Sequence, residues 1–184
     1  QGHYLEINQD GNLTNRKYYS THEIKINKNI NEYEIIEETE RLLIEALKKR
    51  LLVSDVPVGV LLSGGLDSSL IVAMSAAHTN QDINTYSIGF SNKDEEEGNE
   101  FFYSDLVSDK FNTNHKKILT NDEELYNNLE DVIKMMPEPL SGQDAAAFFL
   151  LAKEVSKTQK VVLSGQGADE LFGGYFWYEK MSND

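Results

Sequence analysis

The chain has 184 residues, 40% of them hydrophobic, so it is long enough and apolar enough to bury the core of one globular domain. Its net charge of −14 argues against a general nucleic-acid surface, and the lack of cysteine excludes disulfides, thiolate metal sites and a cysteine nucleophile in these residues. No apolar run approaches the length of a membrane span, and no basic region precedes an apolar stretch at the start. We therefore expect a cytoplasmic protein without nucleic-acid or membrane partners.

The first part of the chain predicts a hairpin, a linker and a long helix. Asp10-Gly11 separates residues 4–7 from residues 17–19, which is typical of a β-hairpin, and the polar residues 20–33 predict a linker. Apolar residues then recur at helical spacing over residues 34–52 and predict an amphipathic helix. Pro57 ends this helix, and residues 58–62 predict the first buried strand.

The sequence Ser-Gly-Gly-Leu-Asp-Ser-Ser follows at residues 63–69, before a stretch at 70–77 that predicts a helix. A glycine turn between a strand and a helix directs backbone N–H groups and a helix N-terminus at one point, which suits a phosphate. Asp67 would repel phosphates unless a cation lay between them, so the run predicts Mg²⁺ together with a polyphosphate. The alternative is a turn rich in serine and glycine that binds nothing.

Strands and helices alternate through the rest of the chain. Strands are predicted at residues 84–90, 115–119 and 160–163, and helices at residues 101–111, 122–135 and 143–156. This order predicts an α/β fold with a doubly wound parallel sheet and helices on both faces. Ligands of such sheets bind beyond the carboxyl ends of the strands, and a second glycine-rich loop, residues 164–175, follows the last strand.

Three blocks of sequence resemble the synthetase domain of the glutamine-dependent asparagine synthetases, which are ATP pyrophosphatases with an adenine nucleotide α-hydrolase-like fold. The blocks are VPVGVLLSGGLDSS at 56–69, YSIGF at 86–90 and SGQGADELFGGY at 164–175. Details at 98–106, 136–139 and 164–178 resemble one branch more closely, the N-acetylglutaminylglutamine amidotransferases.

The resemblance implies an ATP-dependent amide-forming ligase. Such enzymes activate a carboxylate as an acyl-adenylate, release pyrophosphate, and let ammonia from a glutaminase domain displace AMP. Residues 1–19 would be the tail of that otherwise missing glutaminase domain, and residues 34–184 the N-terminal part of a synthetase domain truncated at its C-terminus. We therefore expect a piece of a longer enzyme, with little or no synthesis on its own, whose full-length form is compatible with a homodimer.

The acceptor stays open between aspartate and an N-acylated glutamine dipeptide. Two further alternatives keep the loop: an enzyme that uses another nucleophile, as the β-lactam synthetases do, and a non-catalytic ATP-binding module.

The resemblance also implies roles for individual residues. The nucleotide-binding residues are expected to be Leu61, Leu62, Ser63, Gly64, Gly65, Asp67, Ser68, Ser69, Ile88, Ser164 and Gly165. Asp67 and Asp169 are expected to hold Mg²⁺ and, with Gln166, to form the catalytic set. The alternatives are a helix N-cap for Asp169 and core packing for the apolar residues.

Gln166 departs from the resemblance, because asparagine synthetases commonly carry Glu at this position. A glutamine side chain carries no charge and cannot act as a general base. Either another group takes any proton, or the acceptor is not aspartate. Residues 141–144 depart from the asparagine synthetase pattern as well. Glu138, between two prolines, lies either near the acceptor or in a solvent-facing turn.

Overall fold

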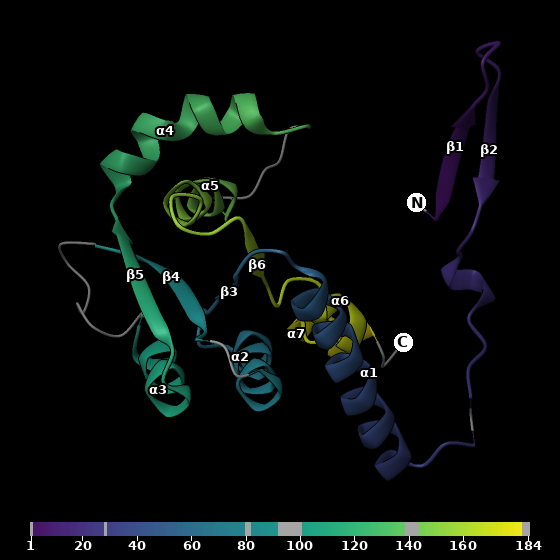
Figure 1. The fold of residues 1–184 in the computed structure, drawn as a ribbon, viewed down its shortest axis with the longest axis horizontal. Coiled ribbons are helices and arrows are strands. Elements are labelled where there is room, and N and C mark those ends of the chain that lie inside the picture. The colour runs from purple at the N-terminus through teal and green to yellow at the C-terminus, as the bar shows by residue number, and fades with distance from the viewer. Residues whose placement is uncertain (1, 28, 80–81, 92–100, 139–143, 182–184) are drawn as a thin grey trace. The chain divides into compact units, whose positions relative to one another are not determined.

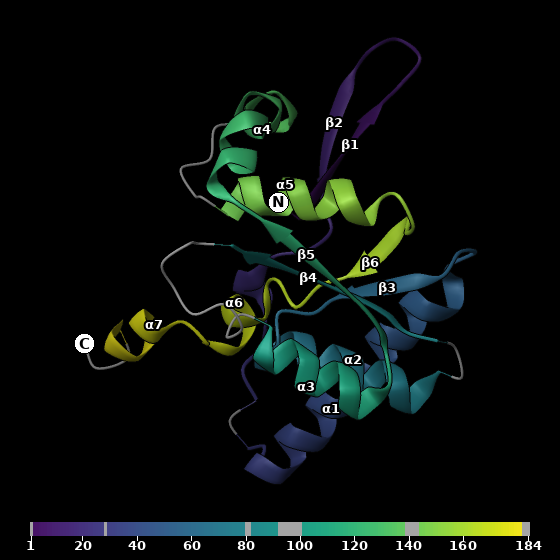
Figure 2. The same ribbon diagram turned by 90° about the vertical axis from the view of Figure 1, so that its left-hand side faces the viewer.

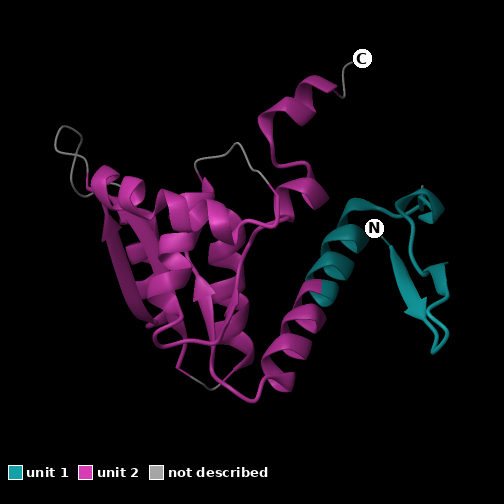
Figure 3. Ribbon diagram, turned by 90° about the horizontal axis from the view of Figure 1, so that it is seen from above, with its two compact units in different colours: residues 1–42 teal, residues 43–184 magenta. Residues whose placement is uncertain are grey.

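The computed structural model describes residues 2–27, 29–79, 82–91, 101–138 and 144–181. The chain divides into two compact units, residues 1–42 and 43–184 (Figure 3). The division falls within helix α1 (Glu32–Val53), so the domain bounds drawn from the sequence at residues 19 and 33 stay a prediction. In the described ranges, no helix combines the length and the apolar character needed to cross a membrane.

The first unit contains the expected hairpin. Strands β1 (His3–Ile7) and β2 (Leu13–Lys17) pair antiparallel, although the second strand begins earlier than the sequence suggested. Gly11 has a φ of 80°, a conformation that glycine adopts at no steric cost in such a turn. After the 3-10 turn η1 (Thr21–Glu23), the side chains of Asn31 and Glu34 each accept a hydrogen bond from the other's backbone N–H, and this capping box starts α1.

The second unit is built on a four-stranded parallel sheet with the order β5-β4-β3-β6 (Figure 1). Its strands are β3 (Val58–Leu61), β4 (Asn84–Phe90), β5 (Asn114–Thr120) and β6 (Val161–Leu163). The chain winds from β3 outward to β4 and β5, and then returns to place β6 on the other side of β3. The direction of winding therefore reverses between β3 and β6, and the predicted doubly wound parallel sheet is confirmed.

Helices cover both faces of this sheet (Figure 2). Helices α2 (Leu66–His78) and α3 (Phe102–Phe111) lie on one face, and α4 (Asp122–Met135) and α5 (Asp144–Val155) lie on the other. Successive strand residues point to opposite faces, so the core is divided in two. One cluster is formed by Val60, Leu62, Val72 and Ile83, and the other by Tyr86, Ile118, Leu151 and Val155.

The bounds of β4 and α4 are those predicted, whereas the glycine-rich loops differ. Helix α2 begins at Leu66 rather than Leu70, with Gly65 as its N-cap, so residues 67–69 already belong to its first turn. Two short helices that the sequence analysis did not predict follow β6: α6 (Ala168–Phe172) and α7 (Phe176–Met181).

Candidate nucleotide site

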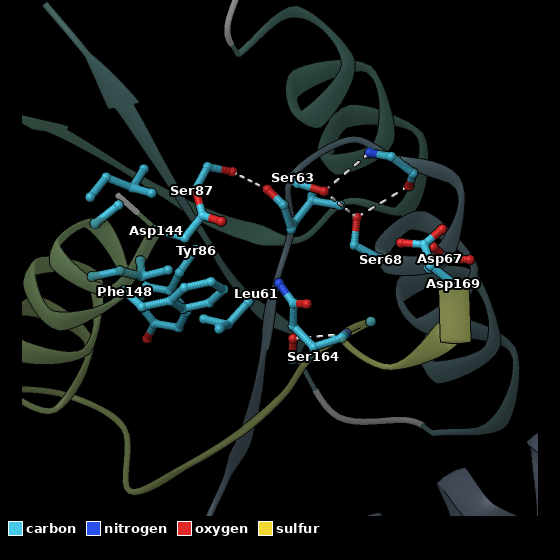
Figure 4. Close-up of a pocket in the computed structure, with 17 residues that line it drawn as sticks. Leu61, Ser63, Asp67, Ser68, Tyr86, Ser87, Asp144, Phe148, Ser164 and Asp169 are labelled. Carbon is cyan, nitrogen blue, oxygen red and sulfur yellow. Dashed lines mark hydrogen bonds between the residues drawn. The ribbon is translucent and has the colours of Figure 1, made fainter. Parts of the chain in front are cut away.

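A pocket of about 290 Å³ lies where the direction of winding reverses, at the carboxyl ends of β3 and β6 (Figure 4). Its walls come from β3 and the loop after it, the start of α2, β4, α5, the loop after β6 and the start of α6. The lining residues are Leu61, Leu62, Ser63, Gly65, Asp67, Ser68, Tyr86, Ser87, Ile88, Asp144, Ala147, Phe148, Leu151, Ser164, Gly165, Gln166 and Asp169. The pocket thus joins the two glycine-rich loops that are far apart in the sequence.

Hydroxyl groups hold the first loop in a tight turn. The Oγ atom of Ser63 lies 3.0 Å from the Oγ of Ser68 and accepts a hydrogen bond of 3.3 Å from the N–H of Gly65. The hydroxyl of Ser68 also lies 3.2 Å from the carbonyl oxygen of Gly65. The first N–H groups of α2 have no partner within the helix, so this turn places an electropositive helix end against the pocket.

Two expected nucleotide residues do not line the pocket but support it. Gly64 has a φ of 86°, and a Cβ atom there would lie 2.6 Å from the Cβ of Tyr103 and 2.7 Å from the nitrogen of Ser104. Only glycine therefore lets the loop pack against α3. The N–H of Ser69 donates to the carbonyl of Gly65, a helical bond of 3.0 Å.

The second loop packs directly on the first. A Cβ atom at Gly165 would lie 2.9 Å from the Cβ of Asp67 and 3.1 Å from the nitrogen of Ser68, so the close approach requires glycine. Gly167, with a φ of 93°, is the N-cap of α6. Asp169 therefore lies in the first turn of α6, and its alternative interpretation as an N-cap is wrong.

Asp67 and Asp169 lie at the same end of the pocket (Figure 4). A Cβ atom at Gly174 would lie 2.0 Å from Oδ1 of Asp169, so the glycine turn after α6 makes room for that carboxylate. Among the residues described, no three His, Cys, Asp or Glu side chains cluster as a complete metal site. Two hard oxygen donors fit Mg²⁺ whose remaining ligands are phosphate oxygens and water.

An aromatic residue supports the second loop. The hydroxyl of Tyr175 donates a hydrogen bond of 2.8 Å to Glu170, and this bond, with the nearby carboxylates, raises the pKa of Tyr175 to about 12. The phenol therefore stays protonated at neutral pH and ties the segment after α6 back to that helix.

Leu61, Leu62 and Ile88 also line the pocket, and their part in nucleotide binding stays a prediction. The side chain of Leu62 is only 1% exposed, so it packs in the core while its main chain borders the pocket. Core packing and pocket lining are both correct for this residue.

Other wall residues were not assigned a role from the sequence. Tyr86 and Ser87 belong to the YSIGF block, and Asp144 ends the segment 141–144 that departs from the resemblance, whereas Phe148 belongs to no motif. Glu138 is exposed, and residues 98–100 and 139–143 lie outside the described residues.

The sheet and its two loops define a class of protein, the adenine nucleotide α-hydrolase-like fold. Similar folds occur in a glutamine-dependent NAD⁺ synthetase from Acinetobacter baumannii in complex with ADP and in an NH3-dependent NAD synthetase from Campylobacter jejuni. The first has a TM-score of 0.53 and 18% identity over 93% of this chain and 31% of that chain. The second has a TM-score of 0.50 and 16% identity over 76% of this chain and 60% of that chain.

Sequence comparison assigns the chain to a family within this class. The model of the family described as asparagine synthase matches residues 38–184, so the chain belongs to the asparagine synthase family. Asparagine synthetase [glutamine-hydrolyzing] 3 of Bacillus subtilis is 30% identical over 96% of this chain. Putative asparagine synthetase [glutamine-hydrolyzing] 2 of Methanocaldococcus jannaschii is 35% identical over 87% of it. The chain spans 30% of the length of each of these relatives.

Proposed function

We propose that this chain is the ATP-binding part of a ligase that joins ammonia to a carboxylate by way of an acyl-adenylate. The observation that carries the proposal is the pocket between β3 and β6, which unites the two glycine-rich loops and two carboxylates. Membership of the asparagine synthase family and the names of the relatives support the same chemistry.

In this proposal the nucleoside lies against the apolar wall made by Leu61, Ile88 and Phe148, and the phosphates lie against the turn of Ser63 to Ser68. The N–H groups at the start of α2 and the serine hydroxyls supply hydrogen-bond donors for phosphate oxygens. Asp67 and Asp169 would hold Mg²⁺, which neutralises charge on the pyrophosphate when it is bound. Gly165 lets the second loop approach the phosphate chain.

The proposed reaction has two displacement steps. An oxygen of the acceptor carboxylate attacks the α-phosphorus of ATP, and the bond from that phosphorus to the bridging oxygen breaks to release pyrophosphate. The nitrogen of ammonia then attacks the acyl carbon, and the bond to AMP breaks to leave an amide. Any proton lost from the nitrogen passes to a group other than Gln166, because a side-chain amide is not a base.

The acceptor is the point on which two candidates differ. Gln166 and Asp144 line the pocket together, and a glutamine that offers both N–H and C=O groups suits an acceptor that itself carries amides. This favours an N-acylated glutamine dipeptide over aspartate.

The test is pyrophosphate release by the full-length protein with Mg²⁺-ATP, glutamine and either acceptor. Release with aspartate alone would contradict the dipeptide candidate, and release with the dipeptide alone would support it. Nucleotide binding without release by any carboxylate would favour a non-catalytic module, and release without incorporation of nitrogen would point to another nucleophile.

The proposed metal role has a separate test. Asp67→Asn and Asp169→Asn keep the volume of the side chain but remove its charge. We expect each to weaken Mg²⁺-dependent ATP binding about tenfold or more, in the range of losses seen when charged contacts are broken. Glu170→Gln is the matched control, because it removes one charge from α6, the helix that carries Asp169. Glu170 itself bonds to Tyr175 and does not line the pocket. Unchanged Mg²⁺ dependence in both Asp variants would disprove the assignment.

The remaining parts of the proposal concern the whole protein. Ammonia would come from glutamine through a glutaminase domain, and a cytoplasmic location would give access to ATP and amino-acid substrates. A homodimer of the full-length enzyme completes the proposed assembly.

A further inference from the structure

A chain of buried and partly buried hydrogen bonds lies behind the pocket, on the face of the sheet covered by α3. The hydroxyl of Ser87 donates to the carbonyl oxygen of Leu62, the last residue before the phosphate loop (Figure 4). The same hydroxyl oxygen lies 3.3 Å from Nε2 of His115. The chain continues from Nδ1 of His115 to Thr85 at 2.8 Å, from Thr85 to Thr113 at 2.8 Å, and from Thr113 to Ser108 at 2.9 Å. The hydroxyl of Ser108 ends it at the carbonyl oxygen of Thr113, 3.4 Å away.

The number of hydrogens determines how this chain can be completed. Each of its six contacts needs one hydrogen, whereas the four hydroxyls supply one each and a neutral imidazole supplies one more. A neutral His115 therefore leaves one contact without a hydrogen. An imidazolium donates from both ring nitrogens and completes every contact in a consistent direction.

The geometry points to the contact that a neutral ring leaves open. Thr113 donates to Ser108, so Thr85 must donate to Thr113 and Nδ1 must donate to Thr85. A neutral ring therefore carries its hydrogen on Nδ1, and Nε2 then faces Ser87 with a lone pair. Ser87 has one hydrogen, which it gives either to Nε2 or to the carbonyl of Leu62. At 3.3 Å, its contact with the ring is longer than the three other contacts between side chains, and only the terminal contact of Ser108 with the Thr113 carbonyl, at 3.4 Å, is longer.

The charged groups around the ring shift the pKa of His115 in opposite directions. The side chain of His115 is only 7% exposed, and its desolvation lowers its pKa below the ordinary value. Asp105, whose carboxylate lies 4.0 Å from Nε2, raises the pKa, and Lys117 lowers it. A hydrogen bond with the backbone of Thr85 and the charge of Asp109 raise it further. Lys117 is itself paired with Asp105 at 2.8 Å. Desolvation is the largest of these effects, so the pKa of the ring lies below its ordinary value.

We propose that His115 is a positioning residue of the nucleotide pocket, acting through Ser87 on the Leu62 carbonyl, and that its protonation is coupled to nucleotide binding. The inference rests on the proposed function, because it takes ATP as the occupant of the pocket. Protonated His115 donates to Ser87 and leaves the Ser87 hydrogen on Leu62, which fixes the main chain where the phosphate loop begins. Since coupling is reciprocal, bound nucleotide then favours the protonated ring.

The first experiment follows the ring of His115 by NMR titration of the full-length protein, with His115→Gln used to assign its signal. In the free protein, Ser87→Ala should lower the pKa of His115, because the charged ring loses an acceptor. An unchanged pKa would overturn the hydrogen-bond chain whatever the pocket binds. Mg²⁺-ATP should raise this pKa in the wild type, and raise it less in Ser87→Ala, in which only the charge of the ligand acts.

The second experiment measures Mg²⁺-ATP affinity between about pH 5 and 8. His115→Leu should bind about fivefold more weakly than the wild type at the acid end, the size expected for one lost buried hydrogen bond. His115→Gln should bind as tightly as the wild type at the acid end, because its amide donates a hydrogen bond without titrating. Its affinity should then vary with pH only as far as ATP itself titrates. Equal affinity of wild type and both variants at every pH would overturn the proposal. If the wild type binds no nucleotide, the proposed function and the coupling are both overturned. The NMR titration of the free protein would still test the chain of hydrogen bonds in that case. If His115→Leu does not fold, the Ser87→Ala titration decides.

Discussion

Substituting Gly165 by alanine tests whether the contact between the two loops builds the nucleotide site. The new methyl group would lie 2.9 Å from the Cβ of Asp67 and 3.1 Å from the nitrogen of Ser68. The Cβ of Asp67 is fixed by the backbone and the nitrogen of Ser68 is part of it, so neither atom can move away unless the start of α2 moves too. Overpacking of this kind costs about 1–3 kcal/mol.

If the loops separate to relieve the clash, that cost appears in nucleotide binding. It then corresponds to a loss of about fivefold to 150-fold in affinity for Mg²⁺-ATP. Isothermal titration calorimetry of the full-length protein measures the affinity, and thermal unfolding in parallel measures any part of the cost that the fold absorbs instead.

Gly167→Ala is the matched control, because a Cβ atom there would meet nothing within 4 Å. Its φ of 93° makes alanine unfavourable by about 1–2 kcal/mol, which should lower the stability of the fold without pushing the loops apart. A Gly165→Ala protein with wild-type affinity and wild-type melting temperature would refute the argument from loop contact. A loss of affinity that is equal in both variants would assign the effect to backbone strain instead.

Three further outcomes are expected. Gly174→Ala should displace the Asp169 carboxylate, because the new Cβ would lie 2.0 Å from its Oδ1, and so raise the Mg²⁺ concentration needed for ATP binding. An unchanged Mg²⁺ requirement would contradict this. Asn121→Ala removes the side chain that accepts from the first turn of α4 at 2.8 Å, and should cost about 1 kcal/mol of unfolding free energy in urea titrations, whereas no change would show that the cap is dispensable. Burial lowers the pKa of His115, so the unfolded chain gains a proton before the folded one as the pH falls below about 6.5. The neutral ring therefore contributes fully to the free energy of unfolding above that pH, and this contribution is lost on acidification. In urea titrations at several pH values, the free energy of unfolding should fall less steeply with decreasing pH in His115→Gln than in the wild type. Equal pH dependence in the two proteins would refute the prediction.

Local patterns were sufficient for much of the second unit. Alternating apolar residues predicted β4 over Asn84–Phe90, and apolar residues at helical spacing predicted α4 over Asp122–Met135, with the bounds that the structure shows. Strand-turn-helix context also identified the first glycine-rich loop, because backbone N–H groups and small residues at such a junction are a local property of the chain. The second loop was found from its place after a strand and from its resemblance to the family block at 164–175. Four of the expected residues of the first loop, Ser63, Gly65, Asp67 and Ser68, line the pocket.

The sequence could not decide which residues oppose these loops across the pocket. Asp144 and Phe148 lie on α5 and reach the site only because the chain returns across the sheet to place β6 beside β3. The bonds that join His115 to Ser87 likewise arise from the parallel register of β4 and β5, which sets Thr85 opposite His115. Periodicity reports which face of an element is buried, but pairing between strands depends on free energies summed over the whole sheet. The two loops could therefore be located from the sequence itself, whereas the apolar wall and the hydrogen-bonded support behind it were decided by the tertiary structure.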